Sequence, residues 1–209
     1  VASDVTGVGT GRSQLGACEY GGDKGIFGYG SDGSSTGVTN LVSNAGVVAS
    51  DVTGVGTARR YLTACSYGND KGIFGYGSTT LSMTNLVSNS GVVATDVTGV
   101  GTGRNALAAC EYGGDKGIFG YGTTGSNVSM TNLVSNAGVV ASDTTGVGSA
   151  RQELTACSYG GDKGIFGFGY NLSVSNTALT NLVSNSGVVA SDVTGVGTGR
   201  GTLAACSFN

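Results

Sequence analysis

A block of about 47 residues is repeated almost five times along this chain, and this repetition limits the fold more than any other feature. One arginine marks the same position in each copy: Arg12, Arg59, Arg104, Arg151 and Arg200. Units of a tandem array pack on their neighbours and are stable only together. We therefore predict a single repeat domain over residues 1–209, with units that begin near these arginines.

Composition narrows the class of protein further. Glycine supplies 41 of the 209 residues, charged residues make up only 11%, and proline, tryptophan and histidine are absent. Apolar residues occur throughout every repeat, so we expect a folded chain. The net charge of −3 gives no reason to expect nucleic acid as a partner. No apolar run approaches the roughly 18 residues of a membrane span, so membrane insertion is not expected either.

Within each unit the apolar residues alternate, and glycine interrupts every stretch long enough for a helix, which predicts short β-strands. The first unit should contain four strands, at residues 15–20, 25–30, 38–43 and 47–52. Alternation would place Phe27 and Tyr29 on one face of the second strand and glycines on the other. Such a strand suits stacked sheets, because an aromatic ring can lie against the bare backbone of the next sheet.

Four antiparallel strands in a unit of about 45 to 50 residues are typical of a β-propeller blade. We predict an all-β propeller with four complete four-stranded blades and single strands of further blades at residues 1–5 and 203–208. The alternative is a β-solenoid-like stacked array, although its coils are usually shorter. The end strands indicate a longer polypeptide or completion by another chain, and open strand edges favour self-association.

Two resemblances support this interpretation. The order Arg-x-x-Leu-x-Ala-Cys, turn, Gly-Ile-Phe-Gly-Tyr-Gly, variable loop, Thr-Asn-Leu-Val-Ser-Asn resembles a degenerate kelch blade over the whole chain. The phrases Thr-Asn-Leu-Val-Ser-Asn and Asp-Lys-Gly-Ile-Phe-Gly-Tyr-Gly also resemble repeats of virion-associated and tail-fibre-like proteins of bacteriophages. The first resemblance implies a propeller in which an arginine precedes each innermost strand. The second implies a virion protein that is assembled in the host cytoplasm.

The copies truly diverge only in the loops between the second and third strands, at residues 31–37, 78–81, 123–128 and 170–178. A kelch-like blade places these loops on the same rim as the arginines, and variable loops on a constant framework often form a recognition surface. The candidate binding residues are Arg12, Arg59, Arg104, Arg151, Tyr170 and Asn171, for a glycan or a protein ligand. In the alternative interpretation, which strict repetition favours, each arginine ties adjacent blades together through backbone carbonyls.

Other repeated residues have structural interpretations. The five cysteines lack the paired spacing of zinc ligands and no histidine is present to activate a thiol, so we expect them to be reduced and buried. Each Asp-Lys pair, such as Asp23-Lys24, should lie in a solvated hairpin turn. The aspartates that precede the Thr-Gly segments, Asp4 and Asp51 among them, are expected to cap their own turns rather than to bind calcium.

Together these features predict a non-enzymatic structural or recognition module that needs no metal or cofactor. The most specific hypothesis is a phage virion or tail-associated propeller that mediates assembly or binds the host surface. Its partners would be further copies of itself, other virion proteins or a host-surface glycan. The alternative is a self-assembling fibre subunit that is extracellular or lies at the cell surface. An enzyme is not expected, because near-identical blades leave little room for one asymmetric catalytic site.

Overall fold

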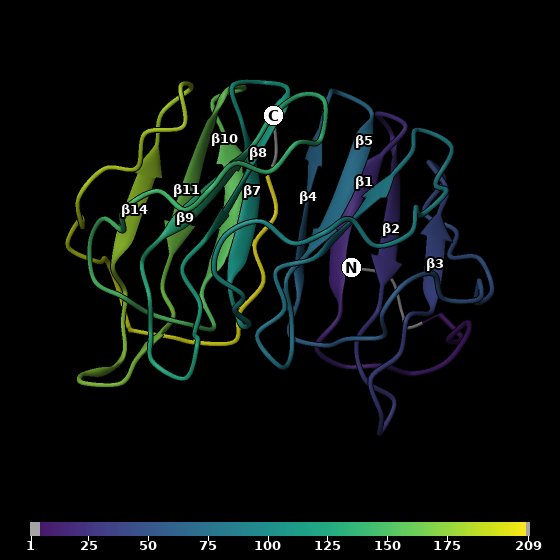
Figure 1. The fold of residues 1–209 in the computed structure, drawn as a ribbon, viewed down its shortest axis with the longest axis horizontal. Helices are drawn as coiled ribbons and strands as arrows, with labels where there is room; N and C mark the ends of the chain where they lie inside the picture. Colours follow the sequence, from purple (N-terminus) through teal and green to yellow (C-terminus); the bar gives the residue numbers. More distant parts are fainter. Residues whose placement is uncertain (1–4, 208–209) are drawn as a thin grey trace.

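The computed structural model describes residues 5–207 and shows small antiparallel β-sheets arranged side by side (Figure 1). In this part of the chain four repeats each form one three-stranded sheet, and a two-stranded hairpin lies in the last variable loop. The sheets contain β1 (Gly16–Tyr20), β2 (Lys24–Gly28) and β3 (Thr39–Val42); β4 (Thr63–Tyr67), β5 (Lys71–Gly75) and β6 (Thr84–Val87); β7 (Ala108–Tyr112), β8 (Lys116–Gly120) and β9 (Thr131–Val134); and β10 (Thr155–Tyr159), β11 (Lys163–Gly167) and β14 (Thr180–Val183). The hairpin pairs β12 (Tyr170–Asn171) with β13 (Ser175–Asn176). Between residues 5 and 207 no helix is long and apolar enough to cross a membrane.

The first two strands of each unit form the predicted tight hairpin. In the first unit Tyr20 lies opposite Lys24, and the intervening turn needs the left-handed backbone of Gly21 and Gly22, at φ angles of 63° and 77°. The Asp-Lys pair forms an exposed ion pair at this turn, with 2.6 Å between Asp23 Oδ1 and Lys24 Nζ. The prediction of a solvated hairpin turn is therefore confirmed.

The prediction of a fourth strand in each unit is wrong, because each unit forms a sheet of three strands. Residues 47–52 run antiparallel to β3, but they pair with it only through isolated bridges, Val42 to Val48 and Thr39 to Val52. Three steps along β3 therefore face four steps along the partner segment. This extra residue interrupts the ladder in the manner of a β-bulge. The segment remains an irregular outer edge, and Val47 is 64% exposed.

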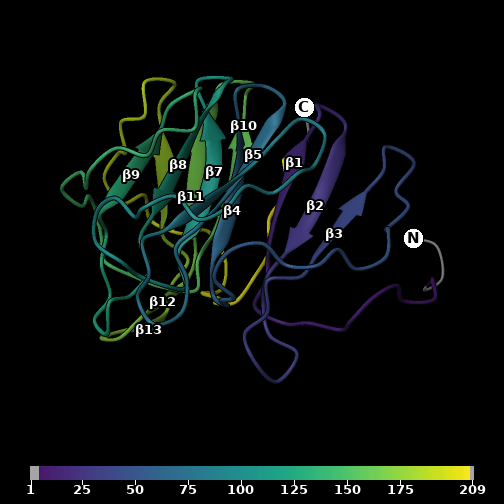
Figure 2. The same cartoon turned by 45° about the vertical axis from the view of Figure 1, so that its right-hand side comes forward.

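The sheets are ordered along the array as in the sequence (Figures 1 and 2). The first strands of neighbouring sheets, β1, β4, β7 and β10, lie next to one another, whereas the third strands of neighbouring sheets make little contact. The arrangement therefore resembles a fan with its first strands at the centre. The first and fourth sheets do not pack on each other within the described residues, so these residues do not form a closed propeller.

Aromatic rings seat against bare backbone between the sheets, as predicted. A Cβ atom on Gly28 would lie 2.6 Å from Cζ of Phe74, so only glycine fits under the tip of this ring. The same relation joins Gly75 to Phe119 and Gly120 to Phe166, and all three phenylalanines are fully buried. These repeated contacts form the core between successive sheets.

Tyr29 departs from the predicted face. Its backbone is left-handed, with φ of 63°, which breaks the alternation that would have placed it beside Phe27. The ring instead packs on the following sheet, edge-on to Phe74 at a centroid distance of 5.2 Å. Its hydroxyl donates a hydrogen bond to the carbonyl of Val55, at 3.0 Å. A single backbone torsion thus turns a second aromatic side chain into the same interface.

Backbone hydrogen bonds also join successive sheets near both ends of the strands. At one end the amide of Gly21 donates to the carbonyl of Asp70, at 2.7 Å. At the other end the amide of Gly30 donates to the carbonyl of Arg59, at 2.9 Å. Equivalent bonds recur along the array. The stack is therefore held by main-chain bonds as well as by buried side chains.

Candidate functional site

The variable loops lie on the edge of the array where the arginine segments enter the sheets. Isolated bridges join Ser13 to Ser31 and Asn105 to Thr123, and a further bridge joins Gln152 to Tyr170. Figure 2 shows β12 and β13 at the lower end of the array, the end at which the chain leaves β2. The loops and the arginine-bearing segments therefore share one rim.

The arginines themselves point into the framework. Arg59, Arg104 and Arg151 have no exposed surface. For Arg104, Nε donates to the carbonyl of Tyr121 at 2.8 Å, Nη1 to the carbonyl of Thr102 at 3.1 Å, and Nη2 to Oδ1 of Asn132 at 2.7 Å. Arg59 and Arg151 make the same three bonds in their own units. These guanidinium groups are satisfied internally and do not reach the rim surface.

Each buried guanidinium also packs on a ring of the preceding sheet. The Arg104 guanidinium carbon lies 4.4 Å from the centroid of the Tyr76 ring, a cation–π distance. Burial lowers the pKa of Arg104, although Tyr76 and Asp143 act in the opposite direction. The arginine therefore links two adjacent sheets and several segments of its own unit.

Arg12 stands apart because no ring covers it in the described part of the chain. Its Nη2 donates to Oδ1 of Asn40 at 2.6 Å, and Nη1 lies 3.5 Å from Oδ1 of Asp51. Its Nε and Nη1 atoms make no hydrogen bond within residues 5–207. Within residues 5–207, Arg12 therefore lacks both the stacked ring and the two further hydrogen bonds that Arg59, Arg104 and Arg151 have.

Tyr170 and Asn171 shape the last variable loop. The backbone groups of Tyr170 exchange hydrogen bonds with Gln152, and its carbonyl also accepts one from the Asn127 side chain at 3.0 Å. The Asn171 side chain donates to the carbonyl of Ala150 at 2.8 Å and accepts from the amide of Ser173 at 2.8 Å. Both residues are half-buried, so they stabilise the loop and also form part of its surface.

The most exposed apolar side chains of this loop are Leu172 and Val174, which are 59% and 67% exposed near its tip. These two residues were not among the predicted binding residues, although their spacing of two residues beside a short strand is a signal in the sequence. The structure brings Tyr170 and Asn171 next to the segment that contains Arg151, through Gln152 and Ala150. The four arginines do not converge, because each belongs to a different sheet.

The prediction that each aspartate caps its own turn is wrong. Asp96 accepts hydrogen bonds from the amide and the hydroxyl of Thr57, which lies 39 residues earlier, at 2.9 and 2.7 Å. Asn85 donates to the same carboxylate at 2.9 Å. Burial would raise the pKa of Asp96, but the bonds from Thr57 and Asn85 outweigh it and lower the pKa. The aspartate therefore fastens the end of a unit to its beginning; Asp4 lies outside the described residues.

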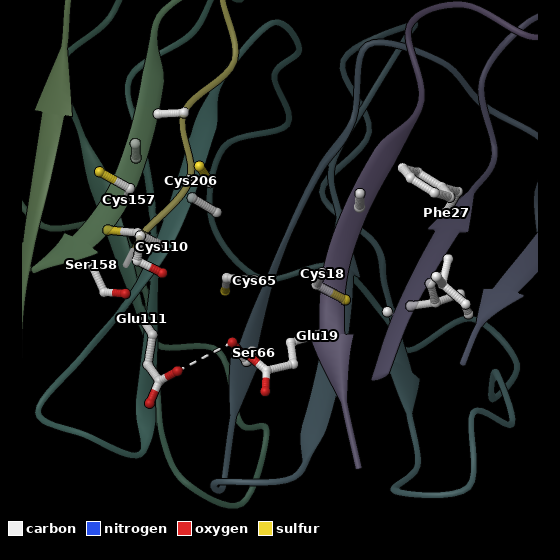
Figure 3. Close-up of a pocket in the computed structure, with 18 residues that line it drawn as sticks. Cys18, Glu19, Phe27, Cys65, Ser66, Cys110, Glu111, Cys157, Ser158 and Cys206 are labelled. Carbon is white, nitrogen blue, oxygen red and sulfur yellow. Dashed lines mark hydrogen bonds between the residues drawn. The ribbon is translucent and has the colours of Figure 1, made fainter. Parts of the chain in front are cut away.

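A cavity of about 400 Å³ lies where the first strands converge (Figure 3). Its lining includes one cysteine from each unit: Cys18, Cys65, Cys110, Cys157 and Cys206. A Cβ atom on Gly72 of the next sheet would lie only 2.5 Å from Sγ of Cys18, and Cys65 and Cys110 face equivalent glycines. Cys65 and Cys110 are buried as predicted, Cys18 and Cys157 are only half-buried, and Cys206 is exposed.

Cys18 and Cys110 lie in an environment that suits a structural role in packing. Burial raises the pKa of Cys18 and of Cys110 to about 12, which is the opposite of what an activated nucleophile requires. The glycines opposite Cys18, Cys65 and Cys110 let these three sulfur atoms fit tightly between two sheets. Within residues 5–207 no cluster of three or more potential metal-ligating side chains is found.

Glutamate and serine alternate at one position of the cavity wall: Glu19, Ser66, Glu111 and Ser158 (Figure 3). The Ser66 hydroxyl donates to Oε2 of Glu111 at 3.1 Å. Burial raises the pKa of Glu111, and the negative charge of Glu19 adds to this effect. The lining of the cavity therefore combines apolar residues with a row of alternating glutamate and serine side chains.

No protein-family model and no curated protein matches this chain. The kelch and phage resemblances remain predictions. The assignment of function therefore depends on the arrangement of constant and variable residues in the structure.

Proposed function

We propose that this chain is a non-enzymatic scaffold, an open segment of a β-propeller that presents variable loops on one rim for recognition. The observation that carries the proposal is the separation of constant from variable residues. The arginines, glycines and aromatic residues that recur in every unit are used between or within the sheets. Sequence differences gather in the loops that follow the second strands.

The propeller assignment is supported by the convergence of the first strands. All four of them, together with residues 205–207, line one cavity, as inner strands line the channel of a propeller. A solenoid would instead stack its coils along an axis without such a common centre. The fan of sheets thus fits an incomplete ring better than a linear stack.

The biological setting that we propose is a phage virion or tail, in which the scaffold mediates assembly or contacts a host-surface glycan or protein. The resemblance of the repeat phrases to phage virion and tail-fibre repeats supports this setting. The polar loops fit a glycan, because serine, threonine and asparagine side chains supply both hydrogen-bond donors and acceptors. Leu172 and Val174 add an apolar contact at the loop tip.

Binding to an array of bacterial surface glycans tests the recognition role. We expect the labelled chain to bind a restricted set of glycans and the double substitution Leu172→Ser with Val174→Ser to abolish that binding. Val188→Ser is the matched control, because Val188 is 65% exposed but lies outside the variable loops. Absence of glycan binding by the unmodified chain, or equal loss in the control, would contradict the glycan-binding role.

A further inference from the structure

The first sheet has an uncovered face. Phe27 is 40% exposed, whereas its counterparts Phe74, Phe119 and Phe166 are fully buried on the preceding sheets. Phe27 borders the central cavity on the side away from β4 (Figure 3). The described part of the chain holds no sheet before β1 that could cover this ring. The phenylalanine of the first sheet is therefore exposed to solvent, whereas the same phenylalanine is buried at every interface between two sheets.

The fourth sheet has the complementary feature, a glycine on which no phenylalanine ring packs. A Cβ atom on Gly167 would meet only Cγ2 of Thr180, at 3.6 Å. A Cβ atom on Gly28 or Gly120 would instead lie 2.6 Å from a phenylalanine Cζ. The Gly167 backbone thus lacks the ring that covers every equivalent glycine.

A second pair of groups is unmatched in the same way. Cys18, Cys65 and Cys110 each face a glycine of the next sheet. A Cβ atom on Gly25, the corresponding glycine of the first sheet, would have atoms of Val42 and the carbonyl oxygen of Cys18 as its nearest neighbours, and no sulfur atom among them. Cys157, the corresponding thiol of the fourth sheet, is only half-buried. The two ends of the array therefore carry complementary halves of one interface.

We infer that this chain associates head to tail with a second copy of itself, the first sheet of one copy packing on the fourth sheet of the next. Phe27 then seats on Gly167, and Cys157 seats on Gly25. We choose a second copy as the partner because the chain forms the same interface three times between its own sheets. The inference does not depend on what the variable loops bind.

Residues 203–207 occupy the inner position beside the fourth sheet and must give way to β1 of the incoming copy. They form no ladder with a second strand, and residues 204–207 are exposed. The bond from the Thr202 amide to the carbonyl of Glu153, at 2.9 Å, holds the start of this segment. By contrast, β1 is paired with β2 along five residues. Strand β1 of the incoming copy is therefore better held by its own sheet than residues 203–207 are, and we expect it to displace them.

This contact is heterologous, since the two surfaces belong to opposite ends of the chain. A heterologous contact continues into longer oligomers unless the rotation closes a ring. We expect sedimentation velocity to show the 20.4 kDa monomer at low concentration and a growing average mass as concentration rises. A monomer at every accessible concentration would overturn the inference.

Two variants block one end each. Phe27→Glu removes the ring from the first sheet, and Gly167→Val places a side chain at its seat on the fourth sheet, where a Cβ atom would meet nothing closer than 3.6 Å. Each variant alone should remain monomeric, while an equimolar mixture should form a one-to-one dimer and nothing larger. The matched control Val188→Glu adds the same charge at an exposed residue outside the contact, since the counterparts of Val188 in the inner units, Val92 and Val139, stay 65% and 66% exposed, and it should associate like the unmodified chain.

The mixing experiment separates this geometry from others. If two first sheets packed on each other, Phe27→Glu would prevent association but Gly167→Val would not. Failure of the mixture to form a dimer would also contradict the head-to-tail contact. Circular dichroism and thermal unfolding of both variants establish that they are folded. A lower average mass in sedimentation velocity then shows that the interface is lost, and not the fold.

Discussion

Replacing one buried arginine tests whether the repeated arginines belong to the framework. Arg104→Ala leaves the carbonyls of Tyr121 and Thr102 and the amide oxygen of Asn132 without their donor, and it removes the cation from the Tyr76 ring. Breaking such a buried charged network typically costs about 3–5 kcal/mol. For a chain of this size each kcal/mol lowers the melting temperature by about 2–4 °C, so we expect a decrease of roughly 6–20 °C.

Arg12→Ala is the matched control because Arg12 donates one hydrogen bond, to Asn40, and no ring of a preceding sheet covers it. A hydrogen bond to a charged group contributes about 1.5–3 kcal/mol, so its loss should cost less. Urea unfolding followed by circular dichroism, with calorimetry for the melting temperature, measures both variants. If Arg104→Ala destabilised the fold no more than Arg12→Ala, the arginines would not be the framework residues described above.

Three further outcomes concern the cysteines and one of the repeated aspartates. A thiol reagent should label Cys206 rapidly but Cys65 and Cys110 only as fast as the chain unfolds, and rapid labelling of all thiols in the folded chain would contradict the burial. Raising the pH from about 8 to about 10 should destabilise the fold by about 1.4 kcal/mol for each buried thiol, since thiols of the unfolded chain lose protons near pH 9 whereas those with a folded pKa of about 12 do not. Urea unfolding of Cys110→Ala should show a shallower alkaline decline. In acid, the hydrogen bonds that lower the pKa of Asp143 stabilise the fold above its ordinary pKa of 3.8 and are lost as the pH falls below it, so Asp143→Asn should flatten the acid decline in the same assay.

Local patterns in the sequence predicted the strands and their stacking. Alternation and the Gly-Gly-Asp-Lys turn located the first two strands of each unit to within two residues. The Gly-Ile-Phe-Gly segment also indicated rings seated on bare backbone, because both partners occur in every copy. A repeated sequence makes such contacts predictable, since each interface joins the same two segments.

Other features depend on information that alternation does not contain. The left-handed backbone of Tyr29 reverses its face, although a non-glycine residue gives no local sign of a positive φ. The extra residue opposite β3 breaks the fourth strand, and it is visible only once the register is known. Asp96 reaches Thr57 across 39 residues, a distance that turn rules cannot address. The arginines were correctly placed near the loops, but their stacking on a tyrosine ring depends on the preceding sheet, which the pattern of one unit does not reveal.

The seating of phenylalanine on glycine between successive sheets is the central claim, and a pair of alanine substitutions tests it most directly. A Cβ on Gly120 would lie 2.6 Å from Cζ of Phe166, whereas a Cβ on Gly167 would meet nothing closer than 3.6 Å. Overpacking costs about 1–3 kcal/mol. Alanine in place of glycine within an open strand gains roughly 0.5–1 kcal/mol. Urea unfolding should therefore show Gly120→Ala less stable and Gly167→Ala at least as stable as the unmodified chain. Equal stability of the two variants would contradict the stacking of the sheets described here.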